Sequence, residues 1–289
     1  MDLGQIGIWS SGLRDEDPRS AGEIRAAAAE LEELGYDAIW LGGSPGVRHA
    51  APLLEATERI VVATGILNIW EYEPADVAEQ AAALADRHSG RFVLGLGASH
   101  AALVKGYRKP YSMMVEFLDR LDRLDAAGSA KEGRVLAALG PRMLTLSRDR
   151  SAGAHPYLIT PEHTAKAREI LGPDSLLAPE VKVVLESDPE RARAAARGHI
   201  APYLGMPNYT GNLLRLGFVD EDFRDGGSDR LIDATFAWGD MEAIRVHLAA
   251  HREAGADQIV LQVVTGGHVP LPRAQWRELA EGLELRCKD

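Results

Sequence analysis

The chain has few of the residues that build cross-linked or metal-rich proteins. Cys287 is the only cysteine among 289 residues, so the chain has no internal disulfide framework and no thiolate metal cluster. The nine histidines are scattered and form no His-Glu-x-x-His motif. His247 and His251 lie four residues apart but lack a third ligand nearby. No Gly-x-Ser-x-Gly elbow is present either. The sequence therefore predicts neither a metal site nor a serine nucleophile.

Long apolar runs and an excess of positive charge are also missing. No stretch of about 18 apolar residues could span a bilayer, and the N-terminus lacks the basic and apolar regions of a signal peptide. The formal net charge of −11 argues against nucleic acid or an anionic membrane as the partner. We therefore expect a soluble, cytoplasmic protein that acts on a small molecule.

The most informative segment is residues 87–100, which contains a Ser-Gly turn, an apolar strand and two glycines near the end of that strand. Residues two apart in a strand share a face, so Gly95 and Gly97 leave one face without side chains. Barrels and doubly wound proteins bind ligands at the C-terminal end of their strands. No Lys-Ser/Thr pair follows, which excludes a P-loop. The segment predicts a floor on which a flat cofactor lies.

Strand-like and helix-like segments alternate along the chain at the spacing of βα units. Each predicted strand is followed by a helical pattern. Eight such units favour a closed (β/α)8 TIM barrel over an open sheet, with residues 1–289 as one domain. The predicted strands are residues 6–9, 38–41, 60–66, 92–96, 135–139, 154–158, 181–185 and 258–263.

Residues 203–238 interrupt this alternation between the seventh and eighth predicted strands. The segment is rich in glycine, aspartate and aromatic residues, and long insertions in barrels commonly form lids or pocket walls. A surface excursion without a role in binding is the alternative. Several large side chains could form an apolar pocket wall or fill a core: Tyr203, Met206, Pro207, Tyr209, Phe218 and Trp238.

A basic stretch precedes and follows a loop of small residues at 151–154. Barrels often bind phosphate through the backbone N–H groups of such loops, so the stretch predicts an anion site. A solvated basic helix face is the alternative. The cationic residues are Arg142, Arg148, Arg150, Lys166 and Arg168.

Four segments of the chain resemble the bacterial luciferase-like oxidoreductases and, among these, the actinobacterial branch that depends on the deazaflavin coenzyme F420. The resemblance lies in the order and spacing of the four segments. It implies a TIM barrel, a flavin-like cofactor at the C-terminal face of the barrel, and a homodimer. The segments are residues 34–40 (Leu-Gly-Tyr-Asp-Ala-Ile-Trp), 62–68 (Val-Ala-Thr-Gly-Ile-Leu-Asn), 89–97 (Ser-Gly-Arg-Phe-Val-Leu-Gly-Leu-Gly) and 153–157 (Gly-Ala-His-Pro-Tyr).

The resemblance also implies roles for individual residues. Gly65 and Ile66 match a bulge with a non-proline cis peptide bond behind the cofactor ring. Asn68 matches a position whose side chain forms a hydrogen bond near the deazaflavin. Trp9 would face the ring or the substrate, or would be an ordinary core aromatic. The other implied cofactor contacts are Gly97 at the strand end, Ala98 and Ser99 in the loop after it, Gly153 and Ala154 at the phosphate, and His155.

Three positions depart from the family pattern. Gly43 and Ser44 stand where many deazaflavin-dependent relatives have an Asp-His pair, and Glu73-Pro74 stands where many flavin-dependent relatives have His-Pro. His100 replaces a catalytic glutamate that some relatives carry after the glycines. Because imidazole titrates near neutral pH, His100 is the candidate proton donor; alternatively it only shapes the pocket.

The leading hypothesis is hydride transfer between C5 of the deazaflavin and an organic substrate, in which the cofactor carries the chemistry and the protein supplies orientation and electrostatics. The basic stretch around Arg148 and Arg150 would hold the phosphate and the acidic tail of the cofactor. A second hypothesis is a monooxygenase that uses reduced FMN and oxygen. A third is a non-catalytic barrel that binds a flavin-type ligand.

Overall fold

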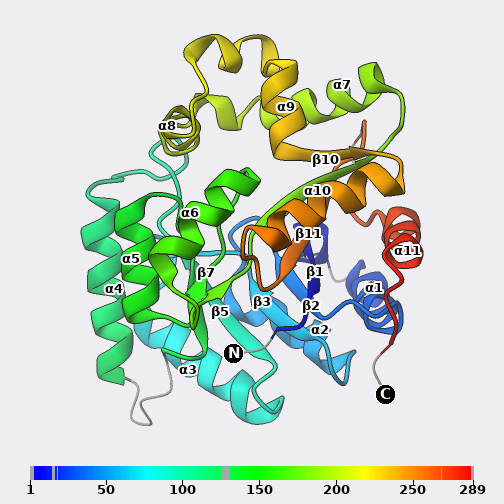
Figure 1. Ribbon diagram of the computed structural model, residues 1–289. Coiled ribbons are helices and arrows are strands. Elements are labelled where there is room, and N and C mark those ends of the chain that lie inside the picture. Colours follow the sequence, from blue (N-terminus) through cyan, green and yellow to red (C-terminus); the bar gives the residue numbers. More distant parts are fainter. Residues whose placement is uncertain (1–2, 15–16, 18, 125–130, 268, 288–289) are drawn as a thin grey trace.

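Parallel strands alternate with helices along the chain and curl into one sheet (Figure 1). The computed structural model describes residues 3–14, 17, 19–124, 131–267 and 269–287. The short β4 (Leu67–Asn68) follows β3 and pairs with β5. The barrel strands are β1 (Ile6–Ser10), β2 (Ala38–Leu41), β3 (Val61–Thr64), β5 (Phe92–Gly97), β6 (Arg134–Leu136), β7 (Gly153–Ala154), β8 (Leu176–Leu177), β9 (Glu180–Leu185) and β11 (Ile259–Val263).

The sheet closes through β8 and β9, which form one barrel strand with a short break. β8 pairs with β7 and β9 pairs with β11. Across the break, the Ala178 N–H donates to the Ala154 carbonyl and the Val260 N–H donates to the Pro179 carbonyl. Counting β8 and β9 together, the described residues contain eight barrel strands. The predicted (β/α)8 barrel is confirmed.

Helices surround the sheet, and five of these surrounding helices in the described residues begin with a proline. Proline suits the first helical position because its missing N–H would have no partner there. The helices around the barrel are α1 (Ala21–Glu33), α2 (Ala51–Glu55), α3 (Pro74–Arg87), α4 (Pro110–Leu124), α5 (Pro141–Arg150), α6 (Pro161–Leu171), α7 (Pro189–Ile200), α10 (Met241–Glu253) and α11 (Arg273–Gly282).

Alternate residues of the strands face two different cores. In β2, Ile39 and Leu41 pack in the layer between the sheet and the helices, whereas Ala38 and Trp40 pack inside the barrel with Val93 of β5. Because successive side chains of a strand point to opposite faces, a strand covered on both faces must be apolar throughout. This requirement explains why the strands were recognisable in the sequence.

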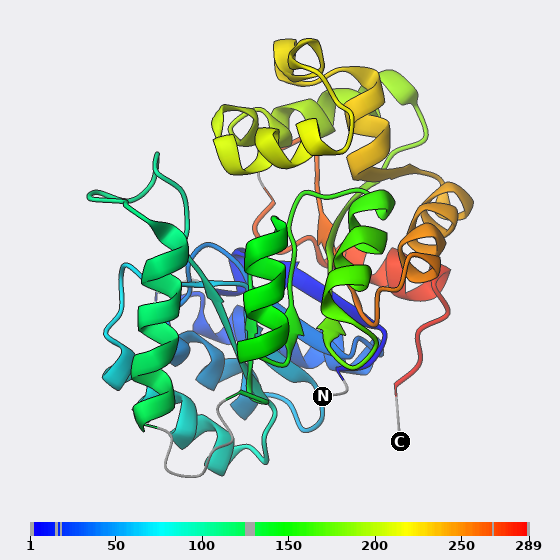
Figure 2. The ribbon, with the colours of Figure 1, turned by 60° about the vertical axis from the view of Figure 1, so that its left-hand side comes forward.

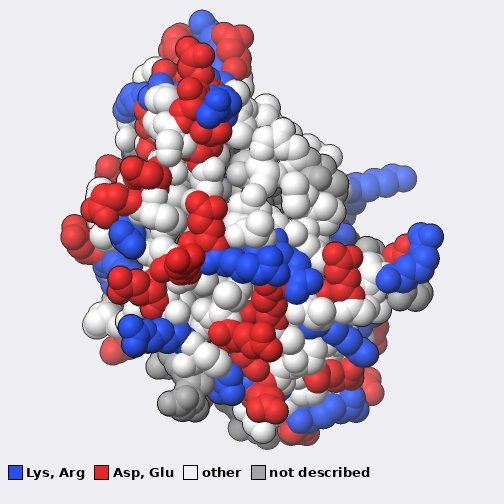
Figure 3. Space-filling view, turned by 90° about the vertical axis from the view of Figure 1, so that its right-hand side faces the viewer, with Lys and Arg blue, Asp and Glu red and all other residues white. Residues whose placement is uncertain are grey.

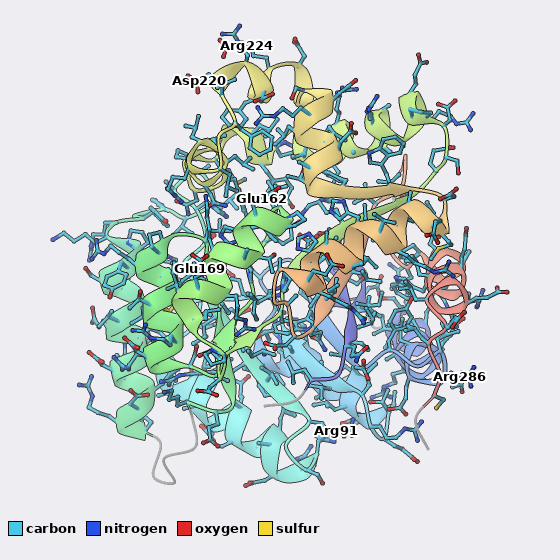
Figure 4. All side chains as sticks on the ribbon, in the orientation of Figure 1. Arg91, Glu162, Glu169, Asp220, Arg224 and Arg286 are labelled. Atoms are coloured by element: carbon cyan, nitrogen blue, oxygen red, sulfur yellow. The ribbon has the colours of Figure 1, made fainter. Side chains whose placement is uncertain are left out.

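The insertion between the seventh and eighth barrel strands lies with α7 over one end of the barrel (Figures 1 and 2). It contains the 3-10 helices Tyr203–Gly205 and Asp220–Gly226, α8 (Pro207–Arg215) and α9 (Asp229–Thr235), and it leads into β10 (Phe236–Gly239), which pairs with β9. Leu213, Leu231 and Ile232 form a separate apolar cluster with residues of α7. Asp220 and Arg224 lie at the tip of the insertion farthest from the barrel, and Arg91 lies at the opposite end of the molecule (Figure 4).

Acidic and basic side chains are mixed over the face of the molecule that carries α11 (Figure 3). In the part of the chain that the structure describes, no helix has the length and apolar character needed to cross a membrane. Met1 and Asp2, on which the signal-peptide argument partly rests, lie outside the described residues.

Candidate active site

A cavity of about 600 Å³ lies between the C-terminal ends of the barrel strands and the insertion. Ligand sites of TIM barrels form at this end because the loops that follow the strands converge there. The cavity is lined by Trp9 of β1, by residues at or after the ends of β2, β3, β5, β6 and β7, and by residues of the insertion. We call the strand side of this cavity the floor and the insertion side the roof.

Trp9, Gly65 and Ile66 line the floor. The Trp9 indole Nε1 donates a hydrogen bond to the Gly65 carbonyl at 2.8 Å, and the peptide bond between Gly65 and Ile66 is cis, as the family resemblance implied. A Cβ atom at Gly65 would lie 3.2 Å from the Trp9 ring and from the Trp40 side chain. Glycine at this position therefore lets two tryptophans pack closely under the cavity.

The two glycines of β5 serve a different purpose from the one predicted. A Cβ atom at Gly95 would lie 1.9 Å from the Thr64 carbonyl oxygen, and one at Gly97 would lie 2.4 Å from the Ile66 side chain. Gly97 lines the cavity, whereas Gly95 does not. The interpretation of both glycines as bare backbone for a ligand is therefore wrong for Gly95. Its missing side chain admits the neighbouring chain instead, which is the other physical reason for glycine in a strand.

The loop after β5 brings Ala98, Ser99 and His100 to the cavity. The His100 ring lies 4.8 Å from the Tyr209 ring, and its Nδ1 is 3.3 Å from the Asn208 side-chain nitrogen. Burial lowers the pKa of His100, so its imidazole is neutral at pH 7. This placement is compatible with the predicted proton transfer, and the role itself stays a prediction.

His155, which follows β7, is 2% exposed and lines the cavity. Its ring stacks on Trp40 with centroids 4.2 Å apart, and its Nδ1 is 2.7 Å from the Ala178 carbonyl oxygen. Burial lowers the pKa of His155 to about 4. The neutral ring therefore keeps its hydrogen on Nδ1, and Nε2 is an acceptor. This Nε2 has no partner among the described residues.

Three residues that the resemblance placed at the cofactor do not line the cavity. Asn68 is buried, and its Nδ2 donates to the Glu71 carboxylate at 2.6 Å. Gly153 and Ala154 lie within β7, where a Cβ atom at Gly153 would be 1.9 Å from the Leu176 carbonyl oxygen. Their predicted location is corrected accordingly: Asn68 holds the turn after β4, and Gly153 permits β7 and β8 to approach.

The basic stretch divides between the two ends of the barrel. Arg142, at the start of α5, lines the cavity. Arg148 and Arg150, at the other end of α5, form ion pairs with Asp149 at 2.8 Å and Asp122 at 2.6 Å. An α-helix rises 1.5 Å per residue, so Arg148 and Arg150 lie roughly 9 and 12 Å along the helix from Arg142. The prediction that Arg148 and Arg150 hold the cofactor is therefore wrong.

The direction of the helices explains this division. Helices of a βα barrel run antiparallel to the strands and begin at the C-terminal face. In α6, for example, Glu162 lies nearer the insertion than Glu169 (Figure 4). Arg168, late in α6, accordingly pairs with Asp257 at 2.6 Å, away from the cavity.

Arg215 is a cavity residue that the sequence did not single out. It ends α8, and its guanidinium is 3.3 Å from the Asn212 side-chain oxygen. The Arg142 guanidinium lies over the Tyr111 ring, 4.3 Å from its centroid. Among the described residues, neither arginine has a carboxylate within ion-pair distance. We call Arg142 and Arg215 the cationic corner, because two cavity cations without an acidic partner favour an anionic ligand.

The roof contains some of the aromatic residues predicted as a pocket wall and not others. Tyr203, Met206, Pro207 and Tyr209 line the cavity. Phe218 is 6% exposed and belongs to the apolar cluster of the insertion, and Trp238 bonds to Asp233 through Nε1 at 2.9 Å. The same residue types therefore serve both of the purposes that the sequence left open.

The architecture agrees with comparisons to known proteins. The model of the luciferase-like monooxygenase family matches residues 4–258. The chain belongs to this family. Membership of a family of enzymes confirms the expectation of an enzyme and identifies the barrel as a luciferase-like one.

Several luciferase-like relatives are similar over nearly their whole length. A Mycobacterium tuberculosis protein that carries the name of a coenzyme F420-dependent oxidoreductase is 24% identical, covering 92% of this chain and 95% of its own. An F420-dependent secondary alcohol dehydrogenase in complex with an F420-acetone adduct has a TM-score of 0.72 at 17% identity, and covers both chains fully at 100%.

Two further solved structures have the same fold. One is of an F420-dependent enzyme, and the other is of an enzyme in complex with FMN. The coenzyme F420-dependent tetrahydromethanopterin reductase of Methanopyrus kandleri has a TM-score of 0.72 at 16% identity, covering 98% of this chain and 99% of that chain. A type II Baeyer-Villiger monooxygenase of Pseudomonas putida in complex with FMN has a TM-score of 0.69 at 14% identity, covering 96% of each chain. Gly43 and Ser44, one of the departures from the family pattern, line the cavity of this chain.

Proposed function

We propose that the protein is an oxidoreductase that uses coenzyme F420 and transfers a hydride between the deazaflavin and a small organic substrate. The similarity to proteins named as F420-dependent supports this proposal. The observation that carries it is the cationic corner, which lies at the same cavity as the tryptophan and glycine floor. F420 has a planar ring, a phosphate and an acidic tail; the floor matches the ring, and the cationic corner matches the anionic groups.

The cavity residues fit such a cofactor. Trp9 and Gly65 offer a flat, largely apolar surface. The buried Nε2 of His155 lacks a donor among the described residues, and a buried acceptor without a partner costs about 1–3 kcal/mol. A ligand N–H or O–H group at His155 would remove that cost. Arg142 and Arg215 would hold the anionic groups by charge-assisted hydrogen bonds.

When bound, the deazaflavin supplies the hydride at C5. The protein positions the reactants between the floor and the roof. His100 is neutral near pH 7 because burial lowers its pKa. A neutral imidazole accepts the proton that an alcohol releases on oxidation, and the imidazolium returns it in the reverse direction.

Equilibrium titration of the purified protein with F420 and, separately, with FMN tests the proposal. Quenching of tryptophan fluorescence reports binding, because Trp9 lies in the floor. We expect saturable binding of F420 at micromolar concentrations and at least tenfold weaker binding of FMN. Absence of F420 binding would rule out the proposed function.

Similarity to an FMN-bound monooxygenase supports a second candidate, a flavin monooxygenase. Reduced deazaflavin reacts poorly with oxygen, so oxygen consumption separates the two candidates. Oxygen consumption that depends on reduced FMN and on an added substrate would favour the monooxygenase.

We also propose a homodimer, which the family resemblance implies. Ala75, Ala82 and Ala83 of α3 are exposed, so this helix offers a surface of small side chains for close packing. Sedimentation velocity measures the mass in solution, and a species of about 31 kDa at micromolar concentration would contradict the dimer.

A further inference from the structure

Two tyrosine hydroxyls meet where the barrel joins the insertion. Tyr157 follows β7 and Tyr203 begins the insertion, and both side chains line the cavity. Their hydroxyl oxygens are 3.0 Å apart. The Tyr157 hydroxyl also donates to the side-chain oxygen of Gln262 in β11 at 2.8 Å. The pair therefore joins the floor, the roof and the last strand of the barrel.

A buried cation lies under this pair. Lys182 and Glu180 of β9 are each 1% exposed, and the lysine Nζ is 2.6 Å from a Glu180 oxygen. The same Nζ lies 3.7 Å from the centroid of the Tyr157 ring. Burial lowers the pKa of Lys182, and the Glu180 carboxylate opposes this shift. A buried ion pair is weak evidence for stability, because apolar replacements are often as stable. Its contact with Tyr157 places the pair directly behind the lining of the cavity.

The hydrogens of the two hydroxyls can align toward the cavity. Each phenol has one hydrogen to donate and two lone pairs to accept with. Burial raises the pKa of both Tyr157 and Tyr203, so both are protonated donors at neutral pH. With the Tyr157 hydrogen on Gln262, the Tyr203 hydrogen points to the Tyr157 oxygen. When a ligand oxygen accepts the Tyr203 hydrogen instead, the Tyr157 hydroxyl can rotate so that its one hydrogen moves from Gln262 to the Tyr203 oxygen. Hydrogen bonds linked in this way polarise and strengthen one another.

The surroundings favour a ligand oxygen that carries negative charge. Tyr209 lies 5.4 Å from Tyr203, and Trp9 lies 5.7 Å from Tyr157, between ring centroids. These rings place aromatic surface around the hydroxyl pair, and a fixed donor in such a site stabilises developing charge more than the same donor does in water. The Lys182 cation against the face of the Tyr157 ring draws electron density from the phenol, which makes its hydroxyl a stronger donor.

We propose that Tyr203 donates a hydrogen bond to the reacting oxygen of a carbonyl substrate, with Tyr157 and Lys182 as positioning residues behind it. This inference deepens the proposed function and rests on it, since the carbon of a polarised carbonyl group accepts a hydride. The substrate class is a carbonyl compound, or the corresponding alcohol, whose apolar part lies against Tyr209 and Met206. The tyrosine pair recognises the substrate oxygen that becomes negatively charged during the reaction.

The probe 4-nitrophenol tests this inference without the natural substrate, because its phenolate oxygen mimics the charged carbonyl oxygen. Absorbance titration of the full-length protein measures both the affinity for the probe and the pKa of the bound probe. We expect a pKa of the bound probe at least one unit below its value in water. Tyr203→Phe should weaken phenolate binding about tenfold, which corresponds to about 1.4 kcal/mol.

Two comparison variants separate the hydroxyl pair from the rest of the cavity. Tyr209→Phe removes a hydroxyl from the same wall, and this hydroxyl has no hydrogen bond with any side chain in the described residues. The substitution should lower the affinity for the phenolate by less than twofold. The double variant Glu180→Leu/Lys182→Met removes the cation without leaving a lone buried acid. It should raise the pKa of the bound probe by about one unit, a shift that a purely structural role would not cause.

The outcomes distinguish this inference from the proposed function. Phenolate binding that is unaffected by Tyr203→Phe but lost in Arg142→Ala would place the probe at the cationic corner and overturn the inference. Normal F420 binding in the same experiment would leave the proposed function intact. Conversely, the expected response to Tyr203→Phe without any F420 binding would support the oxygen site and contradict the proposed cofactor.

Discussion

The floor and the roof of the cavity are held in different ways. In the floor, side chains bond to backbone carbonyls: Trp9 Nε1 to Gly65, and His155 Nδ1 to Ala178. These carbonyls belong to the strands or to the residues next to them, so the sheet itself fixes their positions. The floor therefore has a shape that depends on the backbone of the barrel and little on the choice of surface side chains.

In the roof, side chains bond to other side chains. Tyr203 bonds to Tyr157, and Arg215 bonds to Asn212. Around the insertion, Arg193 pairs with Asp233 at 2.6 Å, and the insertion has its own apolar cluster. Such contacts change with single substitutions while the barrel stays folded. From this difference we propose that the barrel holds the planar cofactor and that the insertion determines which substrate enters.

The largest effect is expected at the buried pair between the two regions. Lys182→Met should lower the free energy of unfolding by about 3–5 kcal/mol, because it leaves Glu180 buried without its cation. Urea denaturation measures the loss. The double variant Glu180→Leu/Lys182→Met should regain most of it. Equal losses in the single and double variants would contradict this account.

Acid should destabilise the floor more than the roof. Burial lowers the pKa of His155 to about 4, below about 6.5 in an unfolded chain. The folded state therefore binds fewer protons, so the stabilisation is complete above pH 6.5 and is lost as the pH falls toward 4. The loss is on the order of 3 kcal/mol, since one pKa unit corresponds to about 1.4 kcal/mol.

Urea denaturation of His155→Gln and His199→Gln between pH 7 and pH 4.5 checks this difference. His199, in α7 beside the insertion, is partly exposed, although burial also lowers its pKa to about 4. His155→Gln should remove more of the pH dependence than His199→Gln. The reverse order would show that the floor is not the region with the larger acid sensitivity.

Glycine substitutions should also have opposite effects in a strand below the floor and in α7 beside the insertion. Gly95→Ala places a Cβ atom 1.9 Å from the Thr64 carbonyl oxygen, and overpacking of this kind costs about 1–3 kcal/mol. Gly198→Ala, in α7, has nothing within 4 Å of the new Cβ atom. It should stabilise the helix by about 0.5–1 kcal/mol. Thermal unfolding of both variants measures the two effects, and equal shifts would refute the comparison.

Substitutions at the two ends of α5 should differ in their effect on cofactor binding and leave the stability of the fold unchanged. Arg142→Ala should weaken F420 binding about tenfold, or about 1.4 kcal/mol, because Arg142 lies at the cavity. Arg148→Ala is the matched control at the far end of the same helix, where Arg148 pairs with Asp149. The fluorescence titration described above measures both. A larger loss of F420 affinity in Arg148→Ala than in Arg142→Ala would support the anion site that the sequence predicted around Arg148.

The barrel and part of its floor were predictable because their signals are local. Apolar runs such as 60–66 show strands buried on both faces, and the match at Gly65–Ile66 implied the cis bond that the structure contains. Asn68 and Gly95 were misplaced because a short sequence motif does not show which face of the chain adjoins the cavity. Glycine permits close approach by a ligand or by another strand. Only the position of the neighbouring strand shows which of these reasons applies at a given glycine.

By itself, the sequence determined the order of the elements, the closed parallel sheet and the end of the barrel at which the cavity forms, because hydrophobic periodicity and turn residues act over a few positions. Only the tertiary structure decided that α5 separates Arg142 from Arg148, that Arg215 joins Arg142, and that Tyr203 meets Tyr157 across 46 residues of chain. These pairings depend on where closure of the barrel and folding of the insertion bring distant segments together, and no local pattern records those distances.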